Sequence, residues 1–461
     1  MRVRRLKFRP IGIVVASFVL VIFVGAGLLC LPFAVKSGEP DFLIALFSAT
    51  SATCVTGHTV VDIFSYFTSF GQAVMLILIQ IGGLGFITII SLFMLYMKKD
   101  VTLSDRKLAL QSAGGLKMMG LKELLKYIFI GTFSLEFLGA VLLSISFVHD
   151  YGWGDGIWQA VFTSVSSFCN AGFSLTGQGG DLSLAGYNSD PLFLITVMAL
   201  ITIGGLGFYV WYDVIKNRFR PSRYSLHTKV VLISTGSILL IAWALFMAFE
   251  WNNPGTIGEM NAVDKVINSL FFAVTPRTAG HYTVDMNYFS DGSYLLTNLL
   301  MFVGGSPGST AGGVKTTTFV VLVLTMITAC RRERQVRVFK RGIEQDDVIN
   351  AVTVSMLYVI AILLSVFIIC GIDGGKDYVS DYGETWVAGI NFKSVLFEVI
   401  SAISATGLTM GITAELSVVS QVILILLMFF GRVGGYTLVL VFSETRRPPA
   451  ITRLPEHIMI G

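Results

Sequence analysis

Phe47-Ser-Ala-Thr-Ser-Ala-Thr-Cys-Val-Thr-Gly57 is the stretch around which the chain is organised, because a similar stretch recurs three more times. The same ten-residue step from a large apolar residue to a glycine leads from Phe162 to Gly172, from Leu270 to Gly280 and from Phe397 to Gly407. Each copy lies between two long apolar segments. Four copies of one short loop predict four walls of a single site.

The composition indicates a polytopic membrane protein. The chain has 461 residues, of which 54% are hydrophobic and 13% charged, and its mean hydropathy is +0.75. Crossing a hydrocarbon core of about 30 Å takes roughly 20 apolar residues as a helix. Eight segments qualify as full spans: 11–33, 70–97, 122–149, 188–215, 226–250, 294–330, 347–371 and 418–443. We therefore expect an all-α membrane fold with eight spans.

The distribution of lysine and arginine predicts the orientation. The segments 1–10, 98–121, 216–226, 331–346 and 444–461 hold 23 of these residues, whereas the loops on the opposite side hold five. Cytoplasmic loops carry the excess of positive residues. The pattern predicts a multi-pass protein of the cytoplasmic membrane with both termini cytoplasmic and the four glycine loops facing outward.

An internal repeat divides the chain into four units, 11–97, 122–215, 226–330 and 347–443, followed by a cytoplasmic tail, 444–461. The second helix of the first unit carries Gly82-Gly83-Leu84-Gly85-Phe86, and the second unit carries Gly204-Gly205-Leu206-Gly207-Phe208. Since every unit begins and ends in the cytoplasm, all four run in the same direction. Parallel units predict a pseudo-fourfold ring around an axial pore.

The loops at 41–57, 155–172, 262–280 and 393–407 are too hydrophobic for solvated loops and too short for two spans. Non-helical backbone at membrane depth is tolerated only when it is buried in protein or lines a water-filled cavity. A short re-entrant helix followed by an extended return satisfies this condition. The plan of each unit is therefore helix, re-entrant pore loop, helix.

The residues at the end of each loop offer backbone carbonyl groups and no carboxylate. A ring of carbonyl oxygens can replace the hydration shell of a monovalent cation. A single such glycine would more often serve packing, but four in register favour a K⁺ filter. The predicted filter residues are Val55, Thr56, Gly57, Asn170, Ala171, Gly172, Thr278, Ala279, Gly280, Ala405, Thr406 and Gly407.

The second helix of the third unit contains Gly304-Gly305-Ser306-Pro307-Gly308-Ser309-Thr310-Ala311-Gly312-Gly313, followed by Lys315. Five glycines and one proline within ten residues cannot form a continuous helix. A simple kink is one interpretation of this stretch. Lys315 either contributes to the function of the stretch or snorkels to the interface.

Arg432 is predicted to lie well inside the last helix, where an arginine costs roughly 2.5–3.5 kcal/mol. Such a residue should face the interior and have a partner. A fixed positive charge beneath a cation filter raises a barrier to permeation. A structural ion pair with Glu136 or another buried acid is the alternative.

Nothing in the sequence indicates an enzyme. No G-x-x-x-x-G-K-[ST] loop occurs, and no nucleophile–base pair or metal-spaced set of ligands is evident. We therefore expect flux to run on the membrane potential or an ion gradient.

His58 and His281 follow two of the loop glycines and are expected to point away from the ion path, although a titrating role at an outer mouth is the alternative. The sequence indicates no functional role for Glu136 or Glu398.

The fourfold plan, the single glycine in each loop and the broken helix of the third unit resemble the Ktr/Trk/HKT superfamily of cation transporters, in particular its Ktr-type membrane subunit. The resemblance covers residues 11–443 and implies potassium uptake through a four-loop filter. It also implies that the glycine-rich stretch is a gating loop below the filter, with Lys315 in its control and Arg432 as a pore barrier. A sodium-preferring or Na⁺/K⁺ transporter of the same fold is the alternative.

The resemblance also implies partners. They are a second copy of this chain, forming a homodimer, and a cytosolic ring of nucleotide-binding subunits that bind ATP, ADP or an NAD-type nucleotide. The basic loops could face an acidic surface of that ring or anionic membrane lipid. K⁺ is the transported ion, Na⁺ is an open alternative as coupling ion, and we expect neither an organic cofactor nor a nucleic-acid partner.

Overall fold

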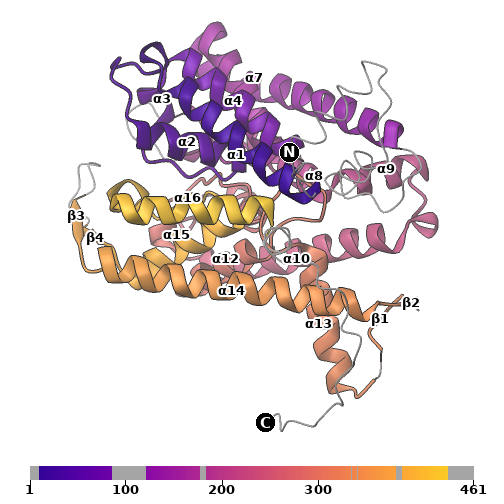
Figure 1. The fold of residues 1–461 in the computed structure, drawn as a ribbon. Helices are drawn as coiled ribbons and strands as arrows, with labels where there is room; N and C mark the ends of the chain where they lie inside the picture. The colour runs from indigo at the N-terminus through magenta and orange to yellow at the C-terminus, as the bar shows by residue number, and fades with distance from the viewer. Residues whose placement is uncertain are drawn as a thin grey trace, which may run out of the picture.

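The computed structural model describes residues 10–85, 121–176, 183–333, 335–339, 341–379 and 387–434, and every structural statement below concerns these residues. The basic start 1–9, the parts of the expected spans at 86–97 and 435–443, and the tail 444–461 lie outside them. The described chain is mostly helical (Figure 1). Two short hairpins, which the sequence did not predict, are the only strands within the described ranges.

The helices occur in four successive groups along the chain. The first group contains α1 (Pro10–Leu29), α2 (Phe42–Cys54), α3 (Ile63–Tyr66) and α4 (Ser69–Leu84). The second contains α7 (Leu121–Cys169), α8 (Pro191–Leu206) and α9 (Phe208–Lys216). The third contains α10 (Leu226–Glu250), α11 (Ala262–Val274), α12 (Asp291–Phe302) and α13 (Thr316–Cys330). The fourth contains α14 (Gln345–Asp373), α15 (Phe392–Ser404) and α16 (Val418–Val433).

Short elements connect these helices. The 3-10 turns are η1 (Pro32–Ala34), η2 (Ala185–Tyr187), η3 (Pro221–Arg223), η4 (Met286–Tyr288) and η5 (Thr413–Glu415). The antiparallel strands β1 (Arg337–Val338) and β2 (Arg341–Gly342) form one hairpin, with Val338 opposite Arg341, beside the projecting helix α13 (Figure 1). The strands β3 (Asp377–Val379) and β4 (Val387–Gly389) form the other, with Tyr378 opposite Ala388.

Glycines end or divide the helices that were expected to be continuous. Gly207, with φ 98°, separates α8 from α9, and the two helices meet at a bend of 90°. The single span expected at 188–215 is therefore broken. Gly434, with φ 88°, ends α16 directly after Val433, so Arg432 lies at the end of this helix and not well inside it. A left-handed φ is open to glycine at little cost, which explains why the breaks fall at these residues.

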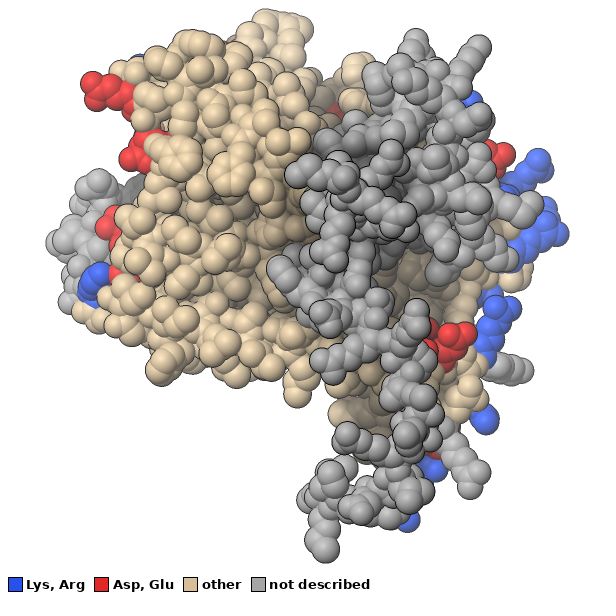
Figure 2. Space-filling view, viewed as in Figure 1, with Lys and Arg blue, Asp and Glu red and all other residues tan. Residues whose placement is uncertain are grey.

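Three described helices, α7, α10 and α14, are long and apolar enough to cross a membrane, and the bent pair α8–α9 gives a fourth candidate. Helices α4, α13 and α16 are apolar but shorter. Figure 2 shows a broad surface of uncharged residues, with lysine and arginine gathered mainly at the end where Figure 1 places α9 and the β1–β2 hairpin. The chain is thus a multi-pass membrane protein, and the number of eight spans stays a prediction.

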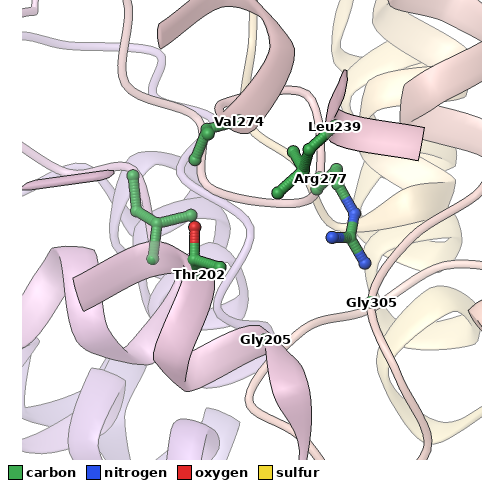
Figure 3. A pocket seen from close by; sticks show the side chains of 7 residues that line it. Thr202, Gly205, Leu239, Val274, Arg277 and Gly305 are labelled. Atoms are coloured by element: carbon green, nitrogen blue, oxygen red, sulfur yellow. The ribbon is translucent and has the colours of Figure 1, made fainter. Parts of the chain in front are cut away.

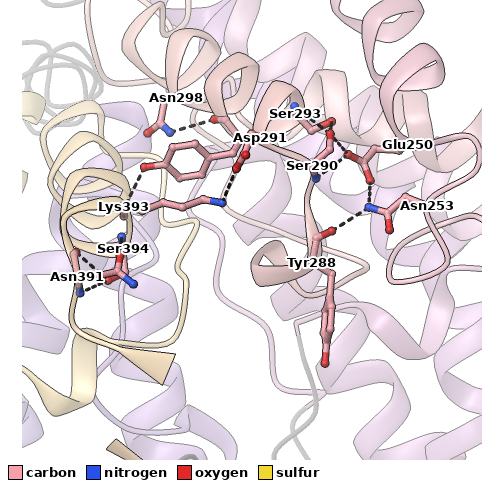
Figure 4. A network of polar contacts seen from close by, with 11 residues as sticks. Glu250, Asn253, Tyr288, Ser290, Asp291, Ser293, Asn298, Asn391, Lys393 and Ser394 are labelled. Atoms are coloured by element: carbon pink, nitrogen blue, oxygen red, sulfur yellow. Dashed lines mark hydrogen bonds and ion pairs between the residues drawn. The ribbon is translucent and has the colours of Figure 1, made fainter. Parts of the chain in front are cut away.

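Acidic side chains tie the first helix of a group to the third. Glu250, at the end of α10, accepts hydrogen bonds from the backbone nitrogen (3.1 Å) and hydroxyl (2.7 Å) of Ser290, which caps α12 (Figure 4). Asp373, at the end of α14, accepts the same pair from Ser417, which caps α16, at 3.1 and 2.7 Å. The two carboxyl groups therefore play equivalent parts: each joins the end of the first helix to the start of the third helix, one in the third group and one in the fourth.

Candidate functional site

Each of the four predicted filter segments follows the C-terminal end of a short helix. In α7 this short helix is the part after Gly152, whose φ of 77° divides the long element. The first residue of every segment has a left-handed backbone: φ is 55° at Val55, 59° at Asn170, 66° at Thr278 and 53° at Ala405. The four loop glycines also have positive φ. Non-glycine residues adopt this conformation at a cost, so the surrounding structure must hold the segments in place.

The backbone N–H groups of the segments donate back to the short helices. Thr56 N donates to Ser51 O at 2.8 Å, and Gly57 N donates to the Ser51 hydroxyl at 3.1 Å. The fourth segment repeats the first of these two bonds, since Thr406 N donates to Ser401 O at 2.9 Å. Ser51 and Ser401 both lie six residues before their loop glycine, as does Ser166, which accepts from Ala171 N at 2.7 Å.

The carbonyl oxygens of the segments are left free of such bonds. Within the described part of the chain, no hydrogen bond ends on a carbonyl oxygen of the predicted filter residues. Residues near the C-terminal ends of α2, α7 and α15 hold the amide groups, so the unpaired oxygens are available to another partner. Buried carbonyl groups without a donor are uncommon in proteins and require an explanation.

The four glycines lie in a closed ring in chain order. A Cβ atom added to Gly57 would lie 2.5 Å from Ala171 O, and one added to Gly172 would lie 2.8 Å from Ala279 O. A Cβ on Gly280 would overlap Thr406 O. A Cβ on Gly407 would overlap Thr56 O, which returns to the first segment. Only glycine allows neighbouring segments to approach this closely.

Glycines in α4, α8 and α16 let these helices pack closely against the short helices that precede the filter segments. Added Cβ atoms would overlap Thr53 O from Gly82, Phe168 O from Gly204 and Ile403 O from Gly431. Each of these carbonyls belongs to the residue four positions before its loop glycine. Gly304 departs from the pattern, because its Cβ would meet Gly312 O within the same loop.

The non-helical stretch between α12 and α13, residues 303–315, lies between the second and fourth groups. Ser306 N donates to Gly205 O at 3.1 Å, and Phe208 N donates to Gly308 O at 2.9 Å, so the stretch is bonded to the break between α8 and α9. On the other side, a Cβ on Gly312 would lie 2.6 Å from Ser404 O. Lys315 donates to Ala311 O at 2.7 Å and thereby closes the stretch.

The Arg432 side chain donates hydrogen bonds to backbone carbonyl oxygens in the first and third groups of helices. Its guanidinium bonds Thr310 O in the glycine-rich stretch, and Gly82 O and Gly83 O at the end of α4. Glu136 is not its partner, since the Glu136 carboxyl group accepts from Gln80 at 3.0 Å. The alternative of an ion pair between Arg432 and Glu136 is therefore wrong, and no described carboxylate pairs with Arg432.

The two histidines after the loop glycines are buried and face neighbouring groups. His58 Nδ1 lies 3.2 Å from a carboxyl oxygen of Glu398 in α15, and His281 Nε2 lies 3.2 Å from the Ser167 hydroxyl. Glu398 also accepts from the Thr409 hydroxyl and from Met410 N at 3.0 Å. These contacts join the segment after Gly57 to the fourth group.

Glu398→Gln is expected to lower stability. The Glu398 carboxyl group accepts from the Met410 backbone nitrogen and from the hydroxyls of Thr409 and Thr413, and a neutral amide would weaken these bonds because they would no longer end on a carboxyl group that can carry charge. A hydrogen bond to a charged group contributes about 1.5–3 kcal/mol, against about 1 kcal/mol for a neutral one. The measurement is the midpoint of thermal unfolding in detergent. Glu415→Gln, at an exposed position after the same loop, is the matched control and should leave the midpoint unchanged. Equal midpoints for both variants would contradict the assignment.

Comparison with known proteins identifies the family. A family model described as "Cation transport protein" (TrkH) matches residues 8–449. The chain belongs to the TrkH family of cation transport proteins. The resemblance to the Ktr/Trk/HKT superfamily is thus confirmed. As a member of this family the protein is a cation transporter, which confirms the expectation that it is not an enzyme.

Individual members of the family match over their full length. The chain is 38% identical to the Ktr system potassium uptake protein B of Bacillus subtilis over 448 residues, which cover 96% of this chain and 95% of that protein. It is also 38% identical to the potassium/sodium uptake protein NtpJ of Enterococcus hirae, over 100% and 99%. The crystal structure of the potassium transporter TrkH from Vibrio parahaemolyticus aligns with a TM-score of 0.72 and 18% identity, covering 96% of this chain and 87% of that one, and supports the shared fold.

The structure brings the predicted filter residues together in the ring and places the glycine-rich stretch and Arg432 in contact with each other. The sequence reasoning missed the partners of Arg432, because backbone carbonyl groups leave no sequence signal. It also missed the role of the serines six residues before three of the loop glycines. Their recurrence at a fixed offset from the glycine was a readable signal.

Proposed function

We propose that this protein takes up K⁺ through an axial path lined by the four glycine segments. The observation that carries the proposal is the closed ring of segments whose carbonyl oxygens accept no hydrogen bond in the described structure. Carbonyl oxygens held in a ring replace the water ligands of K⁺. Several TrkH-family relatives are named as potassium uptake proteins, which supports K⁺ as the transported ion.

The proposed architecture is pseudo-fourfold, with the units 11–97, 122–215, 226–330 and 347–443 running in parallel and eight spans in total. The equivalent packing of Gly82, Gly204 and Gly431 supports this repeat. The short helices would then be pore helices with their C-terminal ends beside the filter. The C-terminal end of a helix carries partial negative charge and stabilises a cation.

The glycine-rich stretch Gly304 to Gly313 is the proposed gate, and Arg432 and Lys315 control it. Its contacts to Ser404 at the end of α15, and to Gly204 and Gly205 of the second group, support a position directly below the filter. Arg432 would act in two ways, as a positive charge that opposes cations and as a clamp on the carbonyl of Thr310.

The proposed location is the cytoplasmic membrane with both termini inside, supported by the concentration of lysine and arginine at one end. We further propose a homodimer regulated by a cytosolic nucleotide-binding ring. Anionic lipid is the alternative partner of the basic end. A Na⁺/K⁺ transporter is the second candidate function, favoured by the similarity to a potassium/sodium uptake protein.

The test is ion flux through the purified chain in liposomes. Under equal gradients, we expect ⁸⁶Rb⁺ uptake, which reports on K⁺, to exceed ²²Na⁺ uptake by at least about tenfold, since one order of magnitude needs only about 1.4 kcal/mol of discrimination. Equal rates would favour the Na⁺/K⁺ transporter. Absence of flux for both ions, with and without the nucleotide-binding subunit, would contradict the proposal.

A further inference from the structure

Arg277 is a buried cation for which the proposed filter and gate give no role. It directly precedes Thr278 of the third filter segment and is only 6% exposed. No described carboxylate forms an ion pair with it. A buried charge without an acidic partner is costly, although the nearby C-terminal end of α11 compensates part of that cost. A function is therefore a better explanation for an arginine at this position than a contribution to stability.

The guanidinium of Arg277 extends from the third loop toward the gate. Figure 3 shows it between Leu239 and the segment at Gly305. One terminal nitrogen lies 3.4 Å from the Thr316 hydroxyl and 3.5 Å from the Thr235 hydroxyl in α10. Thr316 is the first residue of α13, immediately after the glycine-rich stretch.

Thr316 connects to the other end of the same stretch. Its hydroxyl donates to Gly304 O at 3.1 Å, and its backbone nitrogen donates to Gly305 O at 3.0 Å. A hydroxyl group that accepts one hydrogen bond while donating another is polarised, which strengthens the bond it donates. Arg277, Thr316 and Gly304 thus form a continuous polar chain from a filter segment to the beginning of the gate.

A small cavity borders this chain. It has a volume of about 10 Å³, enough for one water molecule, and is lined by Arg277, Gly205 and Gly305 among others (Figure 3). Arg277 Nε donates to no described protein group. A polar side chain at position 277 can therefore be accommodated, which makes glutamine a suitable replacement.

We propose that Arg277 is a positioning residue that couples the third filter segment to the gate and holds the glycine-rich stretch closed through Thr316. The proposal rests on the proposed function, because it assumes that this stretch gates K⁺ flux. It adds that a change at the filter segment is transmitted to the gate by direct contact. The guanidinium geometry, and not only its charge, carries this coupling.

The test uses ⁸⁶Rb⁺ and ²²Na⁺ flux through the full chain in liposomes. Arg277→Gln and Thr316→Val should each raise Rb⁺ flux about fivefold, the scale expected for one lost hydrogen bond. The double variant should exceed neither single variant, because both remove the same connection. Thr235→Val is the matched control, since it removes the other hydroxyl near the guanidinium without contacting the gate, and it should leave flux unchanged. The Rb⁺/Na⁺ ratio should stay at the wild-type value for Thr316→Val, whereas general damage to the pore would lower it.

Several outcomes would overturn the inference. They are multiplicative effects in the double variant, a Thr235→Val effect equal to that of Thr316→Val, and wild-type flux in Arg277→Lys, which would indicate a purely electrostatic role. If Arg277→Gln does not fold, the comparison of Thr316→Val with Thr235→Val still tests the inference.

Arg432→Ala distinguishes a failure of the proposed coupling from a failure of the proposed gate. If it raises flux while the Arg277 and Thr316 variants do not, only the coupling is wrong, and if none of them raises flux, the gate itself is wrong.

Discussion

Gly407→Ala is expected to lower the ratio of K⁺ to Na⁺ flux by at least about tenfold. The added Cβ would overlap Thr56 O and lie 2.8 Å from the Cα of Gly57, so the first and fourth segments would have to separate. The φ of 83° adds a conformational cost of roughly 1–3 kcal/mol for alanine. Because the proposed filter selects the ion by the positions of its carbonyl oxygens, a displacement of two of the four walls should affect discrimination more than total flux. The measurement is paired ⁸⁶Rb⁺ and ²²Na⁺ uptake in liposomes.

Gly236→Ala is the matched control for this prediction. Gly236 lies in α10, and an added Cβ would meet nothing within 4 Å. Alanine also favours the helix by roughly 1 kcal/mol over glycine. The control should therefore retain the wild-type ion ratio. A Gly407→Ala protein that folds and keeps this ratio would show that the ring does not select the ion.

Arg432→Ala is expected to raise cation flux by about one order of magnitude or more and to lower discrimination. At an effective dielectric constant of about 20, two unit charges within about 10 Å of each other repel by more than about 1.4 kcal/mol, which is the energy of a tenfold change in rate. The substitution also releases Thr310 O in the glycine-rich stretch and Gly82 O at the end of α4. Both effects act in the same direction, toward an open path.

Arg432→Lys distinguishes the two effects. Lysine keeps the charge but lacks the planar fork that bonds two carbonyl groups at once. If the charge dominates, the lysine variant should conduct like the wild type. If the clamp dominates, it should conduct nearly as well as Arg432→Ala. Unchanged flux and selectivity in both variants would rule out a barrier role for this residue.

The ring could be anticipated from the sequence because its residues repeat at a fixed spacing. The ten-residue step to Gly57 and its three counterparts identified the segments that the structure brings together. The order of contacts around the ring required coordinates, because it depends on loops separated by more than a hundred residues. The 90° bend at Gly207 was also not expected. Three glycines near the end of an apolar run lower helix propensity, but the direction of the next helix depends on the packing of Gly207 against Pro307.

Arg432 illustrates a different limit. Its apolar surroundings correctly indicated a residue that needs a partner. From residue types alone, a buried acid such as Glu136 was the obvious candidate for that partner. The structure instead satisfies the guanidinium with carbonyl oxygens at a helix end and in a loop. Every residue carries a carbonyl group, so this kind of partner cannot be recognised from residue types. Arg277 was counted only as an outward-side charge, because the threonine hydroxyls that its guanidinium contacts belong to residues 42 and 39 positions away in the sequence.

The ring closes within a single polypeptide, so its four quarters are encoded separately. Val55-Thr56, Asn170-Ala171, Thr278-Ala279 and Ala405-Thr406 present the same backbone with different side chains. A point mutation therefore alters one quarter, whereas in an assembly of four identical subunits it would alter all of them together. Selection can adjust one quarter at a time while the other three preserve a working ring. The same independence allows the third group to carry the non-helical stretch 303–315 without imposing three further copies on the others.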